Sequence, residues 1–316
     1  MRRFRFIAML VLILASAAGC THSKTPTGKR LLRWKFHAGE KFSVHIVQAS
    51  STTFKSDASR QSTKDELVID ELLRVESVDS HGTAKIAMAI ERVRMKSPDE
   101  EIDTASTSTE KTPTDAAIKI ELVKRLIHDI SVHFTIDDRG RVLRAKMNED
   151  AIKAWGPMIP GWSDRLSEKG IMEMLRQLLP VLPDSPLAVG DTWNDAMALN
   201  RADFRNARVK YRYTGPTQYK NATVEKIVTE ATLDWNKERI PKEVTVKVVS
   251  QENPGVVYFD NAAGRLVEIR NTQKRMTEFS KEGRTVQEIF DAVSIIEVNS
   301  GTNPASTPPM RPARQR

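Results

Sequence analysis

Cysteine is nearly absent from this chain of 316 residues, which contains only Cys20. A single cysteine excludes an intramolecular disulfide framework and a cysteine-rich zinc site. Long apolar runs are also missing: beyond the first twenty residues, no stretch approaches the roughly 18 consecutive apolar residues of a membrane-spanning helix. We therefore expect a globular body that does not rely on disulfides and does not cross a membrane as a helix.

Motifs of the common catalytic classes do not occur in the sequence. HExxH, G-x-S-x-G and P-loop patterns are all absent. His128 and His133 stand five residues apart, so they share no helix face and predict no zinc pair. The paired carboxylates of Asp137 and Asp138 lie in a turn composition, which solvated turns commonly have. We expect no enzymatic activity, no cofactor and no metal.

The net charge of +8 is concentrated at the two ends of the chain. Three arginines lie in the first five residues and three in the last six, so the remaining body carries only +2. A body this close to neutral has little counterion-release drive toward phosphate backbones. We therefore expect no nucleic-acid partner.

The first 20 residues have the layout of a secretory signal. A basic start precedes the apolar run Phe6–Leu14, and the small residues Ala15–Gly19 follow. Ala17-Ala18-Gly19-Cys20 resembles the bacterial lipobox. The resemblance implies cleavage before Cys20 and acylation of its thiol, so that acyl chains anchor the mature chain to a membrane. The alternative is a plain signal peptide with a chance cysteine.

Thr21 would be the second residue of the mature chain and is not an aspartate-type retention signal for the inner membrane. The resemblance therefore favours the cell envelope, at the periplasmic face of the outer membrane. The division that we expect is signal peptide 1–19, lipidated tether 20–30, first β unit 31–147 with a disordered insertion near 97–114, helical insertion 148–186, second β unit 187–299 and disordered tail 300–316.

Alternating apolar and polar residues dominate the body and predict a mainly β protein. Leu32, Trp34 and Phe36 alternate with polar residues, and similar runs recur up to Val298. Helices are expected at 116–127, at 148–155 and at 163–179, where apolar residues return at helical spacing. The fold class is thus α+β: a curved antiparallel sheet with inserted helices.

Two pairs of segments indicate an internal duplication. Gly39-Glu40-Lys41-Phe42 and Gly190-Asp191-Thr192-Trp193 each open a strand, and the hairpins at Val132–Leu143 and Val256–Ile269 both carry Gly-Arg after an Asp-containing turn. Duplication would give two half-barrel-like β units. The alternative is that turns simply require Asp and Gly.

The tract Pro186-Leu187-Ala188-Val189-Gly190-Asp191-Thr192-Trp193 resembles a motif of uncharacterised lipoproteins of planctomycete-like bacteria. No activity is known for that group, so the resemblance implies no catalytic residue. The mid-chain helices beside a curved sheet also resemble the plan of bacterial lipoprotein carriers, in which apolar side chains hold acyl chains.

Large apolar residues between hinges of Gly and Pro are candidates for a ligand pocket, although plain core packing is the alternative. The candidates are Trp155, Met158, Ile159, Trp162, Ile171, Met174 and Leu175. We therefore expect a non-enzymatic envelope protein that binds a lipid or acylated ligand. An assembly protein that binds another envelope protein is the main alternative, and a hydrolase with a site built from scattered residues is a further one.

Overall fold

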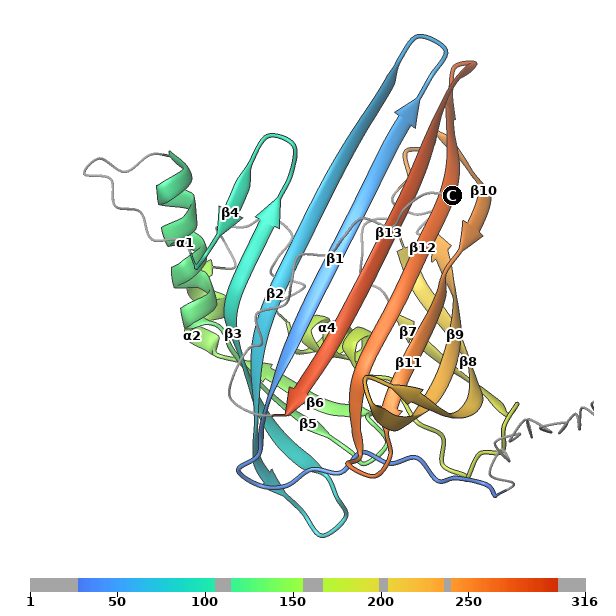
Figure 1. Cartoon of the computed structure of the whole chain (residues 1–316). Helices are drawn as coiled ribbons and strands as arrows, with labels where there is room; N and C mark the ends of the chain where they lie inside the picture. The colour runs from blue at the N-terminus through green and yellow to red at the C-terminus, as the bar shows by residue number, and fades with distance from the viewer. Residues whose placement is uncertain (1–27, 106–114, 156–166, 199–203, 236–239, 301–316) are drawn as a thin grey trace, which may run out of the picture.

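The computed structural model describes residues 28–105, 115–155, 167–198, 204–235 and 240–300 (Figure 1). The predicted signal peptide, Cys20 and the tail beyond Ser300 lie outside these ranges. So does the second half of the predicted insertion near 97–114, residues 106–114.

Antiparallel strands form most of the described chain, as the sequence predicts. The first part contains β1 (Lys41–Lys55), β2 (Arg60–Val78), β3 (Ala84–Lys96), β4 (Glu101–Asp103), β5 (Ser131–Ile136) and β6 (Val142–Met147). The second part contains β7 (Thr192–Ala198), β8 (Phe204–Tyr219), β9 (Ala222–Trp235), β10 (Thr245–Glu252), β11 (Pro254–Asp260), β12 (Arg265–Lys281) and β13 (Arg284–Ser300).

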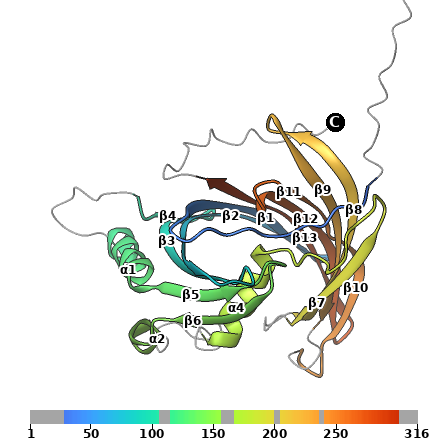
Figure 2. The ribbon, with the colours of Figure 1, turned by 90° about the horizontal axis from the view of Figure 1, so that it is seen from below.

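All thirteen strands belong to one sheet, in the order β6-β5-β3-β2-β1-β13-β12-β11-β9-β8-β7, with β4 beside β3 and β10 beside β12. The sheet curves strongly but does not close, because β6 and β7 are not paired with each other. Figure 2 shows this curve nearly end-on. The predicted curved antiparallel sheet is confirmed.

Three helices of the described residues accompany the sheet: α1 (Asp115–Asp129), α2 (Glu149–Trp155) and α4 (Glu168–Leu178). Ser167 caps α4 by accepting a hydrogen bond from the backbone N–H of Gly170, at 3.1 Å. Figure 2 shows α4 in the opening between the sheet edges β6 and β7, whereas α1 and α2 lie outside the curve. A helix in that position shields edge strands that would otherwise be open to pairing.

The concave face of the sheet carries the hydrophobic core. Val44 and Ile46 point inward from β1, and the register places them beside Val298 and Ile296 of β13. His45 and Val47 point to the outer face because side chains alternate along a strand. Ile171 and Leu175 of α4 pack against the inner face and are both almost fully buried.

Residues 29–38 cross one end of the curved sheet, at the bottom of Figure 1. The alternation predicted there is correct, since Leu32 and Trp34 are buried. The predicted strand is wrong, because this segment bonds to turns instead of a neighbouring strand. The backbone N–H of Trp34 donates to Asp138 O at 2.7 Å, and that of Lys35 donates to Gly264 O at 2.8 Å.

The topology of the sheet repeats. The strands β1, β2, β3, β5 and β6 form one meander, β7, β8, β9, β11 and β12 form another in the same direction, and β13 joins the two. At the start of each meander the glycine N–H and the following acidic residue's C=O bond to one residue of the next strand. The bonds are Gly39 N–H to Val75 O, Val75 N–H to Glu40 O, Gly190 N–H to Tyr213 O and Tyr213 N–H to Asp191 O.

Other boundaries differ from the sequence-based expectation. The strand β4 lies within the predicted insertion. The predicted helices correspond to α1, α2 and α4. None of the helices in the described residues is long and apolar enough to span a membrane.

Candidate functional site

A groove of about 280 Å³ lies on the concave face of the sheet, beside the C-terminal end of α4. We call it the concave groove. The α4 side contributes Arg176, Leu178 and Pro180. Its other lining residues are Asn253, between β10 and β11, and the strand residues Ile46, Gln48, Phe204, Ala207, Val209, Tyr211, Thr229, Ala231, Leu233, Val257, Ile269, Asn271, Thr272, Gln273, Ser294 and Ile296.

The groove lies over rows of residues that the strand register places side by side, and most members of these rows line it. The lowest row, which we call the apolar rung, contains Ile46, Ile296, Ile269, Val257, Ile227 and Tyr213. The next row upward in Figure 1, the polar rung, contains Gln48, Ser294, Asn271, Gly255, Thr229 and Tyr211. Apolar residues return above it, with Val209, Leu233 and Phe204 in the lining. The groove is therefore amphipathic.

The polar rung offers hydrogen-bonding groups that the described parts of the chain leave unused. The side-chain amides of Gln48 and Asn271 form no hydrogen bond with any described residue, and neither does the hydroxyl of Ser294. Gly255 keeps this row open: a Cβ there would lie 2.3 Å from Asn271 Oδ1 and 2.4 Å from Thr229 Oγ1. Gln48 is exposed, and Asn271 and Ser294 are half-buried, so these groups are accessible to a ligand in the groove.

Within the part of the chain that the structure describes, Arg176 is the only charged residue in the lining of the concave groove. It lies in the last turn of α4 and is exposed. Burial raises the pKa of Asp195. The positive charges of Arg176 and Arg139 oppose that rise, so Asp195 lies near both arginines. Burial and the charge of Asp195 raise the pKa of Tyr211, so its phenol stays protonated and can donate a hydrogen bond.

A second arginine lies beyond the upper part of the groove and is already neutralised. Arg275 is 7% exposed, and its Nη2 is 3.0 Å from Glu288 Oε2. Its guanidinium lies 5.0 Å from the ring centroid of Phe204 and 5.2 Å from that of Phe290. Such a charge, paired and held between aromatic rings, stabilises the wall of the groove.

The sequence-predicted pocket residues do not line this groove where they are described. Ile171 and Leu175 are packed in the core, and Met174 is 43% exposed. The side chain of Trp155 and the residues Met158, Ile159 and Trp162 lie outside the described part. The same helix contributes instead through Arg176 and Leu178.

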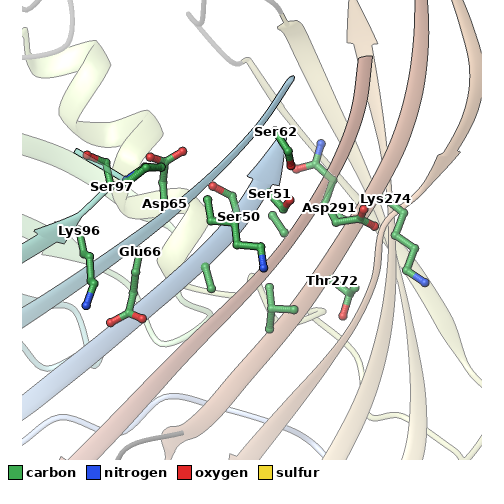
Figure 3. Close-up of a pocket in the computed structure, with 16 residues that line it drawn as sticks. Ser50, Ser51, Ser62, Asp65, Glu66, Lys96, Ser97, Thr272, Lys274 and Asp291 are labelled. Atoms are coloured by element: carbon green, nitrogen blue, oxygen red, sulfur yellow. The ribbon is translucent and has the colours of Figure 1, made fainter. Parts of the chain in front are cut away.

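The outer face carries a second, larger hollow of about 790 Å³, which we call the outer trough (Figure 3). The register places two rows of its lining on this face: Lys64, Ser51, Asp291 and Lys274, and then Glu66, Ala49, Val293 and Thr272. Figure 3 shows its acidic and basic side chains interspersed: Asp65 and Glu66 on β2, Lys96 on β3, Lys274 on β12 and Asp291 on β13. No single sign of charge dominates, so the trough has no preference for a small ion.

No protein-family model matches the chain, and no curated protein is significantly similar to it in sequence. Solved structures match it over most of its length, but at low similarity. A protein of YmcC-like fold from Bacteroides fragilis, described as exported, is 7% identical, with a TM-score of 0.23, 82% of this chain covered and 97% of that chain. An outer membrane channel from Pseudomonas putida F1 is 9% identical, with a TM-score of 0.24 and coverages of 84% and 97%. At these TM-scores the likeness carries no argument about function.

Sequence reasoning missed the concave groove because its lining comes from six strands and one helix. One local signal was present. In each of β1, β12 and β13 an isoleucine lies two residues from a residue with an amide or hydroxyl group on the same face: Ile46 and Gln48, Ile269 and Asn271, Ile296 and Ser294. Three such steps at one level of a sheet indicate a polar row in an apolar face.

Proposed function

We propose that this protein is a non-enzymatic, lipid-anchored protein of the cell envelope that binds one apolar or acylated ligand in the concave groove. The observation on which this proposal rests is the polar rung, a row of hydrogen-bonding groups set between apolar residues of the groove lining. A ligand with an apolar body and a polar group matches both parts. The anchor at Cys20 and the place in the envelope rest on the lipobox-like sequence.

The size and shape of the groove support a small occupant. Ligand sites of drug-like molecules have volumes of about 300–1,000 Å³. At about 280 Å³ the concave groove suits a single acyl chain better than a complete multi-chain lipid. The sheet is open between β6 and β7, where α4 lies, so a shift of α4 would widen the groove without breaking a strand pair.

Native mass spectrometry tests this function. The full chain would carry Cys20→Ser, so that no anchor forms, and would be exposed to envelope extract before gentle purification. We expect an added mass that is lost on denaturation and is extractable into organic solvent. A bare mass after saturating exposure would contradict the proposal.

Two variants, each with one alanine replaced by tryptophan, show which hollow holds the bound molecule. Ala231 lines the concave groove and Ala49 lines the outer trough, and both lie on strands of the same sheet. Ala231→Trp should abolish the added mass because the indole fills the groove. Ala49→Trp should leave it unchanged. The reverse pattern would place the ligand in the outer trough and overturn the proposed site.

The assembly function is the second candidate, and the outer trough is the observation that favours it. Its rim mixes both signs of charge, and Val293 is 38% exposed within it. Mixed charge around exposed apolar area is typical of protein–protein surfaces. A co-purifying protein that Ala49→Trp removes, with no small adduct, would favour assembly over ligand binding.

A further inference from the structure

Charge is distributed unevenly around the concave groove. Among the described residues that line it, none is acidic and Arg176 is the one basic residue. A cation in a lining whose described residues include no carboxylate attracts ligands that carry a negative group.

Arg176 remains available to a ligand, unlike Arg275. No described residue forms a hydrogen bond or ion pair with the Arg176 side chain, whereas Arg275 is paired with Glu288. Asp195 lies near Arg176 but does not line the groove. The C-terminal end of a helix also favours a cation, which accounts for a basic residue in the last turn of α4 but not for its place in the groove.

Neutral donors stand beside this cation in the same lining. The amides of Gln48 and Asn271 and the hydroxyl of Tyr211 can all donate hydrogen bonds. Together with a guanidinium they match the several oxygen atoms of a carboxylate or phosphate, for which arginine is the preferred partner. The apolar rung below them is suited to an alkyl chain.

We infer that the concave groove selects single-chain amphiphiles with an anionic head group, and that Arg176 determines this selectivity. The inference rests on the proposed function, since it names the ligand class of the same groove. The alkyl chain lies on the apolar rung, and the head group lies between Arg176 and the polar rung. Neutral and cationic amphiphiles of equal chain length bind less tightly.

Isothermal titration calorimetry with three matched probes tests the inference: dodecanoate, dodecanol and dodecylammonium. The protein is the full chain with Cys20→Ser, freed of bound lipid. We expect dodecanoate to bind at least about tenfold more tightly than dodecanol, the ratio that a charge-assisted hydrogen bond provides. Dodecylammonium should bind most weakly.

Three variants, each with one arginine replaced, test whether Arg176 causes the preference for dodecanoate. Arg176→Gln should remove the preference for dodecanoate while leaving dodecanol binding nearly unchanged, and Arg176→Lys should restore part of it. Arg212→Gln is the matched control, because Arg212 is exposed on β8 and does not line the groove. The Arg212→Gln variant should prefer dodecanoate over dodecanol as strongly as the parent protein does.

The outcomes separate the two proposals. Equal affinity for dodecanoate and dodecanol, or a preference that survives Arg176→Gln, overturns the anion selectivity and leaves ligand binding in place. Failure of all three probes to bind overturns the proposed function itself. If dodecylammonium binds most tightly, the groove prefers a cationic head group, and the proposed preference for an anionic one is wrong.

Discussion

The indole of Trp34 lies directly against Gly140. A Cβ on Gly140 would lie 2.5 Å from Trp34 Nε1 and 2.6 Å from Pro180 O, and the glycine has φ +87°. The turn between β5 and β6 thereby packs against residues 29–38, the segment that crosses one end of the sheet. Gly264 does the same in the β11–β12 turn, where a Cβ would lie 2.4 Å from the side chain of Lys35.

Gly140→Ala should lower the free energy of unfolding by about 2–4 kcal/mol, because it combines a left-handed backbone with a steric clash. Gly39→Ala is the control: Gly39 has φ +82°, but nothing lies within 4 Å of the position that a Cβ would take there. It should cost only about 1 kcal/mol. Urea unfolding midpoints measure both. Equal losses would mean that the contact with Trp34 contributes nothing.

Glu71 gives the fold a pH dependence near neutrality. It is 5% exposed on the concave side of β2, next to Val44 in register, and it has no hydrogen bond or ion pair with the described residues. Burial raises its pKa from 4.5 to about 7. Below pH 4.5 the carboxyl is protonated in both the folded and unfolded states, so its effect on stability is then absent.

As the pH rises from 4.5 to about 7, the unfolded chain loses the Glu71 proton first, and stability falls. Above that range the loss stays constant at about 3 kcal/mol. Glu71→Gln should therefore flatten the decline in unfolding free energy between about pH 5 and about pH 8. Glu91→Gln, an exposed control on β3, should not. If the unfolding free energy of Glu71→Gln still declines over this pH range, other titratable groups cause the decline.

The β8–β9 turn reaches across the outer face of the sheet and is held there by charge. Lys220 Nζ lies 3.2 Å from Glu268 Oε2 and 3.0 Å from Glu297 Oε1, and the Tyr219 ring stacks on Tyr258 with centroids 3.9 Å apart. Glu268 is 1% exposed, and the Tyr219 hydroxyl also donates a hydrogen bond to it. A buried carboxylate depends on such partners.

Lys220→Met should lower the unfolding free energy by about 1–3 kcal/mol, since it removes a cation from a buried carboxylate. The control is Lys247→Met, which breaks the exposed pair with Glu278 at 3.8 Å. That pair should contribute no more than about 0.5 kcal/mol. Thermal or urea unfolding distinguishes the two. Similar losses in both variants would show that burial of Glu268 does not matter.

How far the sequence predicts this fold depends on the kind of local signal. Turns with Gly and Asp predict β5 and its hairpin well, because the turn chemistry is local. The upper parts of β1 and β12 are polar, as in Ser50–Thr53 and Gln273–Lys274, so their alternation fades although pairing continues. The concave groove depends on register between residues as distant as Ile46 and Ile296, which no local pattern specifies.

Asn271→Leu tests whether the polar rung serves binding or folding. The side-chain amide of Asn271 has no hydrogen-bond partner among the described residues, so leucine of similar size should leave stability within about 1 kcal/mol or raise it. Affinity for dodecanol should fall several-fold, because the hydroxyl loses a hydrogen-bond partner worth about 1 kcal/mol. Asn194→Leu, on exposed β7 surface, should change neither quantity. If Asn271→Leu destabilises the protein strongly while dodecanol affinity is unchanged, the rung is a structural element, because a side chain needed only for the ligand cannot stabilise the empty fold.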